Sequence, residues 1–263
     1  MYANKAPEVE ASLHYIQDHI FDPLSLGKIA HEAGYSPYHF TRIFKAHMGI
    51  SLFYYVSSLR LQKAKDLLLH TELTIRDIAL EVGQQSLGTF TTRFTQKVGV
   101  SPAVFRKTAK EAEKALETIK RLEEAKTDNE PSGDQCSMHG TIEAEIPYEG
   151  IVLIGLFPKP IPEGIPLHGT LVKLPGRFCF SGVRPGVYYL MGTSVSWGMR
   201  AESILLTQKN LRTRNHQPLE ISPEKNTVPL KVKLHLPQLD DPPILVSLPF
   251  LMNRFLRQKK QMG

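Results

Sequence analysis

The feature that most constrains this chain is a segment between Leu24 and Arg106 that occurs twice. Its landmarks are Ile29-Ala30-x-x-x-Gly34, Phe40 and Gly49-x-Ser51, and again Ile78-Ala79-x-x-x-Gly83, Phe90 and Gly99-x-Ser101. The Ile-Ala-x-x-x-Gly elements lie 49 residues apart and the later landmarks lie 50 apart. Chance similarity would not hold its register in this way, so the pattern indicates a duplicated structural unit.

Each copy predicts a helix-turn-helix. Gly34 and Gly83 stand where a first helix must end, because glycine accepts the left-handed cap conformation without penalty. Ser36-Pro37 is an N-cap followed by a proline at the first helical position, which predicts the start of the second helix. From there Phe40, Ile43 or Phe44, and Met48 recur at helical spacing and should face the core. A helix-turn-helix leaves the outer face of its second helix free to enter the major groove of DNA.

The outer faces of these second helices supply the candidate DNA contacts. Their side chains have the reach and the donors for base edges and phosphates. A lone arginine on a helix is usually solvated surface, but the doubled motif favours the binding role. The candidates in the first copy are Pro37, Tyr38, Thr41, Arg42 and Lys45, and those in the second are Ser86, Leu87, Thr91, Thr92, Arg93 and Lys97.

A long helix is predicted between the copies. Residues 52–69 contain neither proline nor glycine and carry apolar residues at helical intervals. These 18 residues would form a rod of roughly 27 Å at 1.5 Å per residue. Such a rod could hold two recognition helices about one DNA turn apart, roughly 34 Å, so that one chain spans two successive segments of the major groove.

The segment from about Val9 to Arg106 resembles the DNA-binding domain of AraC/XylS-type regulators, two helix-turn-helix units joined by a long helix. The resemblance covers about 100 of the 263 residues. It implies a bacterial regulator of transcription, more often an activator than a repressor, and it implies that Tyr38, Thr41 and Arg42 face bases. Double-stranded DNA is then the expected partner, with RNA polymerase a further possible one. The matching residues are Leu26-x-x-Ile29-Ala30, Gly34-Tyr35-Ser36, Phe40-x-Arg42-x-Phe44-Lys45, Tyr55-x-x-x-x-Arg60-Leu61-x-x-Ala64, Ile78-Ala79-x-x-x-Gly83 and Gly99-Val-Ser-Pro102-x-x-x-Arg106.

The second unit departs from the pattern of that family. Gln84 stands where the family usually has Phe, and the arginine of its helix is Arg93, one position after Thr92. A shift of one residue turns a side chain by roughly 100° around a helix, so Arg93 should not replace the base contact. Gly88 near the start of this helix costs about 1 kcal/mol relative to alanine. We therefore expect the first unit to supply most of the specificity and the second to hold phosphate through Thr91, Thr92, Arg93 and Lys97.

The chain divides at a polar linker. Residues 8–108 should form the double helix-turn-helix domain, 109–137 a connecting helix and linker, and 138–263 an accessory domain. Lys110–Lys126 has helix-forming composition with a narrow apolar stripe, which favours a solvated connecting helix packed along one side over a dimerisation helix. Thr127–Ser137 is polar and rich in turn residues. We expect residues 1–126 to fold alone and to keep DNA binding.

After the linker, short strand-like segments alternate with proline and glycine turns, which predicts an antiparallel β-sandwich and an α plus β chain overall. The element Phe178-x-Phe180-x-Gly182, followed by Pro185-Gly186-x-Tyr188, resembles transthyretin-like and carboxypeptidase-regulatory-like sandwiches and implies seven strands. Residues 249–260 should be a terminal strand or helix. The strand-like segments are 151–157, 170–174, 177–180, 187–191, 203–207 and 228–236.

Two roles remain open for this accessory domain. It could bind a small-molecule effector, with Tyr188, Tyr189 and Trp197 lining a pocket, although such aromatics are more often core. Alternatively it could be structural or recruit a partner, with no effector at all. A domain of this architecture hosts many unrelated functions, so its fold alone does not decide.

Composition and motifs argue against other classes of protein. The net charge of +6 and the pI near 9.2 suit a polyanionic partner, yet each half of the chain, divided after Lys126, carries +3, so the motifs rather than bulk charge locate the DNA site. The histidines lack metal-ligand spacing, Asp240-Asp241 should be a turn, and neither Cys136 nor Cys179 has the context of a zinc site or a repair methyltransferase. We expect no enzyme activity and no cofactor. A disulfide between the cysteines stays open, with the reduced state favoured. The N-terminus lacks a signal-peptide pattern and no apolar run has membrane-spanning length, so a cytoplasmic protein without membrane contact is expected.

Overall fold

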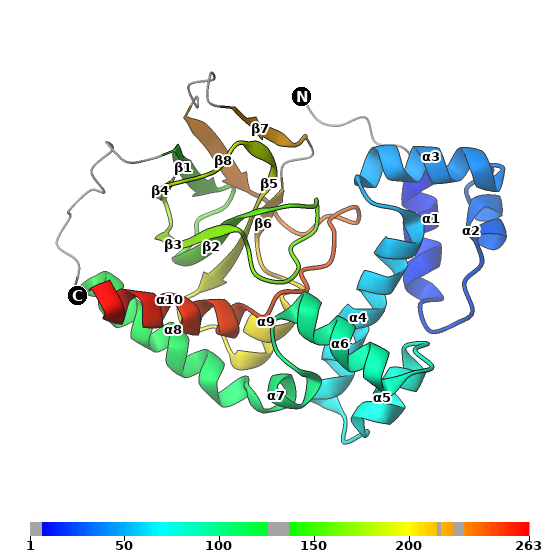
Figure 1. The fold of residues 1–263 in the computed structure, drawn as a ribbon, viewed down its shortest axis with the longest axis horizontal. Helices are drawn as coiled ribbons and strands as arrows, with labels where there is room; N and C mark the ends of the chain where they lie inside the picture. Colours follow the sequence, from blue (N-terminus) through cyan, green and yellow to red (C-terminus); the bar gives the residue numbers. More distant parts are fainter. Residues whose placement is uncertain (1–6, 126–136, 215–216, 223–228, 263) are drawn as a thin grey trace.

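A computed structural model describes residues 7–125, 137–214, 217–222 and 229–262 of the chain. The helical half comes first and the sheets follow (Figure 1), so the predicted α plus β class is confirmed. The helices of the first half are α1 Pro7–Asp18, α2 Leu26–Glu32, α3 Pro37–Met48, α4 Leu52–His70, α5 Ile75–Glu81, α6 Leu87–Val98, α7 Pro102–Lys107 and α8 Ala109–Glu124.

The residues that cap the helices recur at equivalent positions in the two copies of the repeat. The Ser36 and Ser86 hydroxyls accept from the backbone N–H three residues on and begin α3 and α6. Ser51 and Ser101 begin α4 and α7 in the same way. Gly34 and Gly83, which follow α2 and α5, both have a φ of +74°, as the left-handed cap requires. The two helix-turn-helix units therefore start and stop at corresponding residues.

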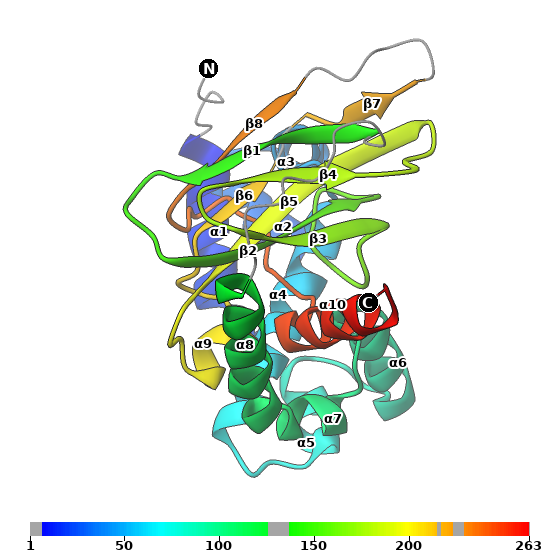
Figure 2. The same cartoon turned by 90° about the vertical axis from the view of Figure 1, so that its left-hand side faces the viewer.

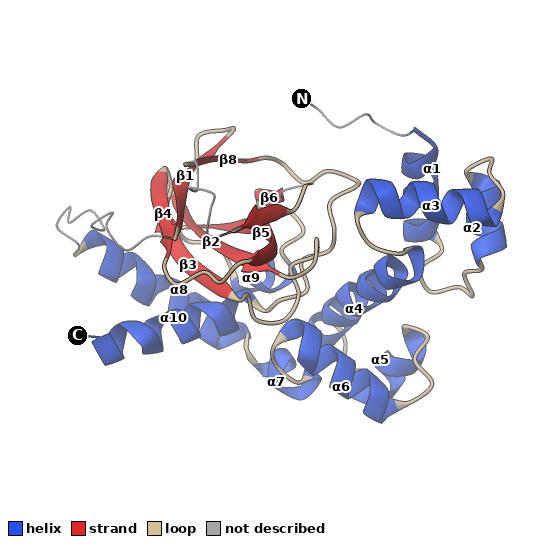
Figure 3. Cartoon of the chain, turned by 45° about the horizontal axis from the view of Figure 1, so that its top comes forward, coloured by secondary structure: helices blue, strands red, loops and turns tan. Residues whose placement is uncertain are grey.

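The cores of the two units match as well. Phe40, Phe44 and Met48 of α3 are buried, and so are Phe90, Phe94 and Val98 of α6. An edge-on aromatic contact completes each core. Tyr55 of α4 meets Phe44 with ring centroids 5.6 Å apart, and Phe105 of α7 meets Phe94 at 5.7 Å. Each second helix is thus pinned by its apolar face, which leaves the opposite face outward (Figure 3).

The C-terminal half contains two sheets that share an apolar core. One sheet has the order β4-β1-β8, and the other has the order β3-β2-β5-β6, with β7 paired to β5. Val152 and Ile154 of one sheet and Met138 and Phe178 of the other lie in the core between them. The strands are β1 Met138–Ala144, β2 Gly150–Phe157, β3 His168–Lys173, β4 Gly176–Phe180, β5 Gly186–Ser196, β6 Arg212–Arg214, β7 Leu219–Ile221 and β8 Leu230–Leu234.

Three features differ from the expected sandwich. Strands β1 and β8 are parallel, although the other pairings are antiparallel. The segment predicted as a strand at 203–207 is instead the helix α9 Ala201–Leu206, whereas the C-terminal segment is the helix α10 Leu248–Met262, one of its two predicted alternatives. A third layer covers the outer face of the larger sheet, where α8, α9 and α10 pack on residues such as Ile151 and Val195 (Figures 1 and 2).

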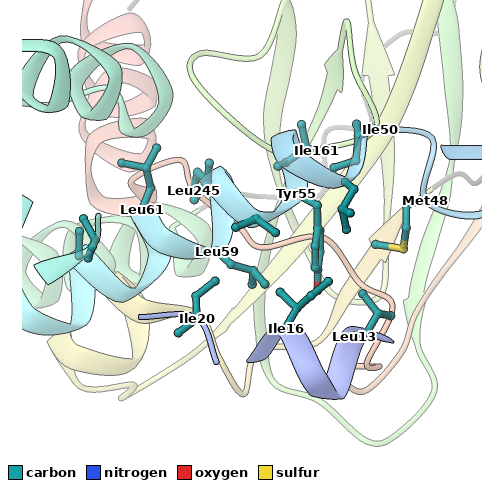
Figure 4. Close-up of a cluster of buried hydrophobic side chains, with 14 of the residues drawn as sticks. Leu13, Ile16, Ile20, Met48, Ile50, Tyr55, Leu59, Leu61, Ile161 and Leu245 are labelled. Atoms are coloured by element: carbon teal, nitrogen blue, oxygen red, sulfur yellow. The ribbon is translucent and has the colours of Figure 1, made fainter. Parts of the chain in front are cut away.

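The polar linker does not separate two independent cores. Ile161, Leu205 and Leu245 of the C-terminal half belong to the apolar cluster of the helical half (Figure 4). The apolar stripe of α8 is buried against α10 and the larger sheet while the opposite face is exposed, as expected of a connecting helix packed along one side. Residues before the linker and residues after it therefore pack together in the same apolar clusters.

The remaining structural expectations have clear outcomes. Cys179 is disulfide-bonded, so the expected reduced state is wrong for this residue; Cys136 lies outside the described residues. Asp240-Asp241 lies in a turn as predicted, closed by a hydrogen bond from the Asp241 amide to the Gln238 carbonyl at 3.1 Å. Within the described ranges, no histidine, cysteine and carboxylate side chains gather as a metal site would need. No helix in the part of the chain that the structure describes could span a membrane.

Candidate nucleic-acid interface

The helix α3 presents the first set of candidate contacts together. Pro37, Tyr38, Arg42 and Lys45 are all exposed, and Tyr38 reaches 77% exposure despite its large ring. Thr41 is half-buried, and its hydroxyl donates to the Pro37 carbonyl at 2.8 Å. Tyrosine and arginine side chains exposed along one helix provide a ring for stacking and a planar fork of donors for base edges.

The helix α6 brings together most of the second set. Leu87, Thr92 and Arg93 are exposed, and Thr91 is half-buried. Ser86 is exposed too, but its hydroxyl already accepts from the Thr89 amide at 3.3 Å as the N-cap of the helix. A hydroxyl that caps a helix can still donate its own proton, so this site keeps one donor for a phosphate.

The two departures from the family pattern touch each other. The Arg93 guanidinium donates to the Gln84 side-chain oxygen at 3.3 Å. Arg93 therefore leans back toward the turn between α5 (Ile75–Glu81) and α6, whereas Arg42 of α3 makes no side-chain hydrogen bond within the described part of the chain. In the first unit the position of Gln84 is held by Tyr35, whose ring lies 5.1 Å from that of His39.

Lys97 lies apart from the other candidates. Its ammonium pairs with the Glu163 carboxylate at 2.5 Å and lies 3.9 Å from the centroid of the Tyr54 ring. Glu163 also accepts from the Tyr54 hydroxyl. Burial lowers the pKa of Lys97, against the opposing effect of Glu163. This lysine is engaged with the loop after β2 and is not available to DNA in this arrangement.

The corresponding position of the first unit makes a corresponding contact. His47 lies fifty residues before Lys97, and its Nε2 is 3.6 Å from the Asp240 carboxylate. Asp240 also accepts from Arg214 at 3.1 Å, and the hydrogen bond with His47, reinforced by Arg214, lowers the Asp240 pKa to about 2. The last turns of α3 and α6 are thus each tied to an acidic residue of the C-terminal half.

Two arginines position the units by donating to backbone carbonyls. Arg60 donates to the carbonyls of Ile20 and Asp22, at 3.0 and 2.8 Å, and so fixes the chain before α2. Arg106 donates to the carbonyls of Leu68 and Leu73, at 3.1 and 2.5 Å, and fixes the chain before α5. The two arginines lie 46 residues apart rather than 50, so they do not occupy equivalent positions of the repeat. Their acceptors are backbone atoms, which no side-chain pattern reveals.

Comparison with known proteins identifies the helical region. The profile of a helix-turn-helix domain family matches residues 29–108. The uncharacterized HTH-type transcriptional regulator YobQ of Bacillus subtilis is 35% identical over 98 residues, which cover 37% of this chain and 41% of that protein. The bifunctional transcriptional activator/DNA repair enzyme AdaA of the same organism is 37% identical over 102 residues, covering 39% of this chain and 48% of that protein.

A solved AraC-type DNA-binding domain-containing transcriptional regulator from Chromobacterium violaceum is 28% identical, covers 39% of this chain and 91% of that chain, and has a TM-score of 0.38. The chain spans less than half the length of the two curated relatives named above. The matches to YobQ and AdaA, over 98 and 102 residues, each span about the length of one domain, as the duplicated segment does. Residues 29–108 of this chain therefore form a helix-turn-helix domain similar to those of transcriptional regulators, in agreement with the AraC/XylS resemblance of the sequence.

Proposed function

We propose that the chain binds double-stranded DNA in a sequence-specific way and regulates transcription, with α3 and α6 in two successive segments of the major groove. The observation that supports this proposal is that α3 and α6 match each other and pack in equivalent apolar cores at the two ends of α4. The 19 residues of α4 make it about 28 Å long, close to the spacing of one DNA turn. We further propose that the chain activates transcription, as the family resemblance implies, and a reporter gene tests this.

The division of labour follows from the exposed side chains. Tyr38, Arg42 and Lys45 are exposed on α3, and their side chains form no hydrogen bond or ion pair with the described residues, so α3 should read bases. On α6 the corresponding position of Arg42 is Thr92, and Arg93 is turned toward Gln84. We infer that α6 mainly contacts phosphates, which positions the domain but carries little sequence information.

We expect Arg42→Ala to weaken binding to the preferred site by about 1–3 kcal/mol and to change binding to random DNA little, because a bidentate base contact is lost. The preferred site is first selected from a random duplex library with the unaltered protein. Arg121→Ala, which removes an exposed arginine from α8, serves as the control and should change neither affinity. Equal losses on preferred and random DNA would show that Arg42 contacts only phosphate.

We expect Thr92→Arg to tighten DNA binding and to steepen its dependence on salt concentration. The new guanidinium would occupy the position that Arg42 has in the first unit, and each added phosphate contact raises the salt slope by about one. Binding is measured over a series of salt concentrations, with Thr92→Gln as an uncharged control of similar reach. If the affinity and the slope both stay unchanged, α6 does not approach the DNA.

A further inference from the structure

A cavity of about 270 Å³ lies between the larger sheet, α10 and the loop that follows β2. Figure 2 shows α10 beneath β3, on the side of the sheet away from β1 and β4. Most of the lining residues are apolar, among them Leu153 and Leu171 from the sheet and Leu251 and Phe255 from α10. The volume falls near the lower end of small-molecule sites, which are concave and mostly apolar with a few polar groups.

The rim of this cavity leaves apolar side chains in water. Ile165 and Leu167 belong to the loop after β2 and line the cavity, and they are 44% and 57% exposed. Neighbouring exposed apolar side chains at the mouth of a cavity mark a surface that an occupant can cover. A ligand with an apolar body would bury both side chains and the inner wall together.

The polar side chains that line the cavity favour a ligand with a negative charge. Arg254, His168 and Gln258 contribute to the lining, and none of the described lining residues is acidic. Arg254 forms no ion pair within the described part of the chain, and it is exposed at the cavity mouth. An arginine guanidinium binds a carboxylate through two parallel charge-assisted hydrogen bonds. The site is therefore suited to a ligand with an apolar body and an anionic head.

The walls of the cavity continue directly into the contacts that hold α6. Pro162 and Ile165 line the cavity, and between them the Gly164 amide donates to the Lys97 carbonyl at 2.6 Å while Glu163 pairs with Lys97. Val246 and Leu248 also line it, and the Ser247 amide between them donates to the Val98 carbonyl at 2.8 Å. A ligand that orders these two walls would therefore order the last turn of α6.

We propose that this cavity is the binding site for a small apolar carboxylate, whose head contacts Arg254 and whose binding fixes the last turn of α6 through Gly164 and Ser247. The binding site is independent of the proposed function, whereas an effect on DNA occupancy rests on it. Binding to the folded chain alone raises its stability by mass action. The site can therefore be tested without DNA.

The test of the site uses the full chain with octanoate and phenylacetate as probes and octanol as the uncharged counterpart of octanoate. At least one of the two carboxylates should raise the midpoint of thermal unfolding and bind in calorimetry. Arg254→Gln should weaken that binding about tenfold, the effect of one lost charge-assisted contact. Arg257→Gln, an exposed arginine of the same helix outside this cavity, should not. Binding of neither carboxylate, equal binding of octanol, or equal losses in the two variants would overturn the proposal.

The coupling to α6 is read from amide hydrogen exchange of the full chain, with and without the carboxylate that binds. The amides of Gly164 and Ser247 should exchange several-fold more slowly when the cavity is filled. The Gly34 amide, which donates to the His31 carbonyl within the first unit at 2.9 Å, is the internal control and should not change. Binding without slower exchange at Gly164 and Ser247 would refute the coupling, and a failure of DNA binding would leave both readouts intact.

Discussion

We expect Lys65→Met to raise the free energy of unfolding by roughly 2–4 kcal/mol at mildly acidic pH. Lys65 lies in α4 with 0% exposure, and among the described residues its ammonium meets only the Ile244 carbonyl, at 3.1 Å, and the Phe105 ring, at 5.6 Å. Burial lowers its pKa from 10.5 to about 7, with Asp66 acting weakly in the opposite direction. Keeping Lys65 charged in the fold therefore lowers the free energy of unfolding by on the order of 5 kcal/mol. The substitution recovers this amount less about 1–3 kcal/mol, because the Ile244 carbonyl is left without its donor.

The burial of Lys65 makes the free energy of unfolding depend on pH. Between about pH 7 and 10.5 the unfolded lysine holds a proton that the folded lysine has lost. Unfolding then takes up a proton, so the free energy of unfolding rises with pH, by at most about 1.4 kcal/mol per pH unit. Below about pH 7 both states are protonated, this slope vanishes and the cost of burial is present in full. The methionine variant lacks the slope, so its advantage should shrink and then reverse toward alkaline pH.

Denaturant unfolding from about pH 6 to about pH 9 measures this difference. Lys114→Met, an exposed lysine of α8, is the matched control and should keep the slope of the unaltered chain. A constant difference between Lys65→Met and the unaltered chain over this range would mean that Lys65 stays charged in the fold. The effect would then have to come from packing alone.

The helical domain was readable from the sequence because its determinants are local. Ser36 begins α3 through an amide three residues away, and Gly34 ends the preceding helix by its own φ of +74°. Phe40 and Phe44 follow from helical periodicity alone. Each of these signals occurs twice, so the second copy confirms the first. Tyr38, Arg42 and Lys45 were assigned to the outer face by the same periodicity, and they are exposed there.

The errors arose where a distant contact decides the outcome. Residues 203–207 are apolar and short, a pattern that does not distinguish a strand from a buried helix. Their helix α9 begins with the Ala201 amide donating to the Glu113 carboxylate, a partner 88 residues away. Lys97 has the periodicity of an outer-face residue, but its partner Glu163 lies 66 residues along the chain. Local patterns cannot report such partners.

The same long-range contacts decide what happens when the chain is cut at the linker. The sequence alone predicts that residues 1–126 fold and bind DNA by themselves. The structure leads us to expect instead that a fragment of residues 1–125 loses much of its stability and self-associates. Removing Ile161, Leu205 and Leu245 from the helical core forfeits about 1.5–3 kcal/mol for each buried side chain. That sum is a large part of the 5–15 kcal/mol typical of a whole domain. The apolar stripe of α8 would be uncovered as well.

A second fragment separates these two causes. Residues 1–108 lack α8, so they should stay monomeric even though their melting temperature remains below that of the full chain. Sedimentation, binding of a hydrophobic dye and thermal melting compare the fragments. If residues 1–125 are monomeric and melt as high as the full chain, the shared core contributes nothing and the linker is a true domain boundary.

Lys65 supplies an internal check on this last prediction. In the full chain its ammonium is enclosed by Ile244 of the C-terminal half, whereas the fragments lack that residue and let water reach the ammonium. Rehydration relieves the cost of burial, because a charge in contact with water needs no protein partner. Lys65→Met should therefore stabilise the full chain by several-fold more than it stabilises residues 1–108. An equal gain in both would show that Lys65 is buried by the helical domain alone, and that the C-terminal half is a neighbour of that core rather than a part of it.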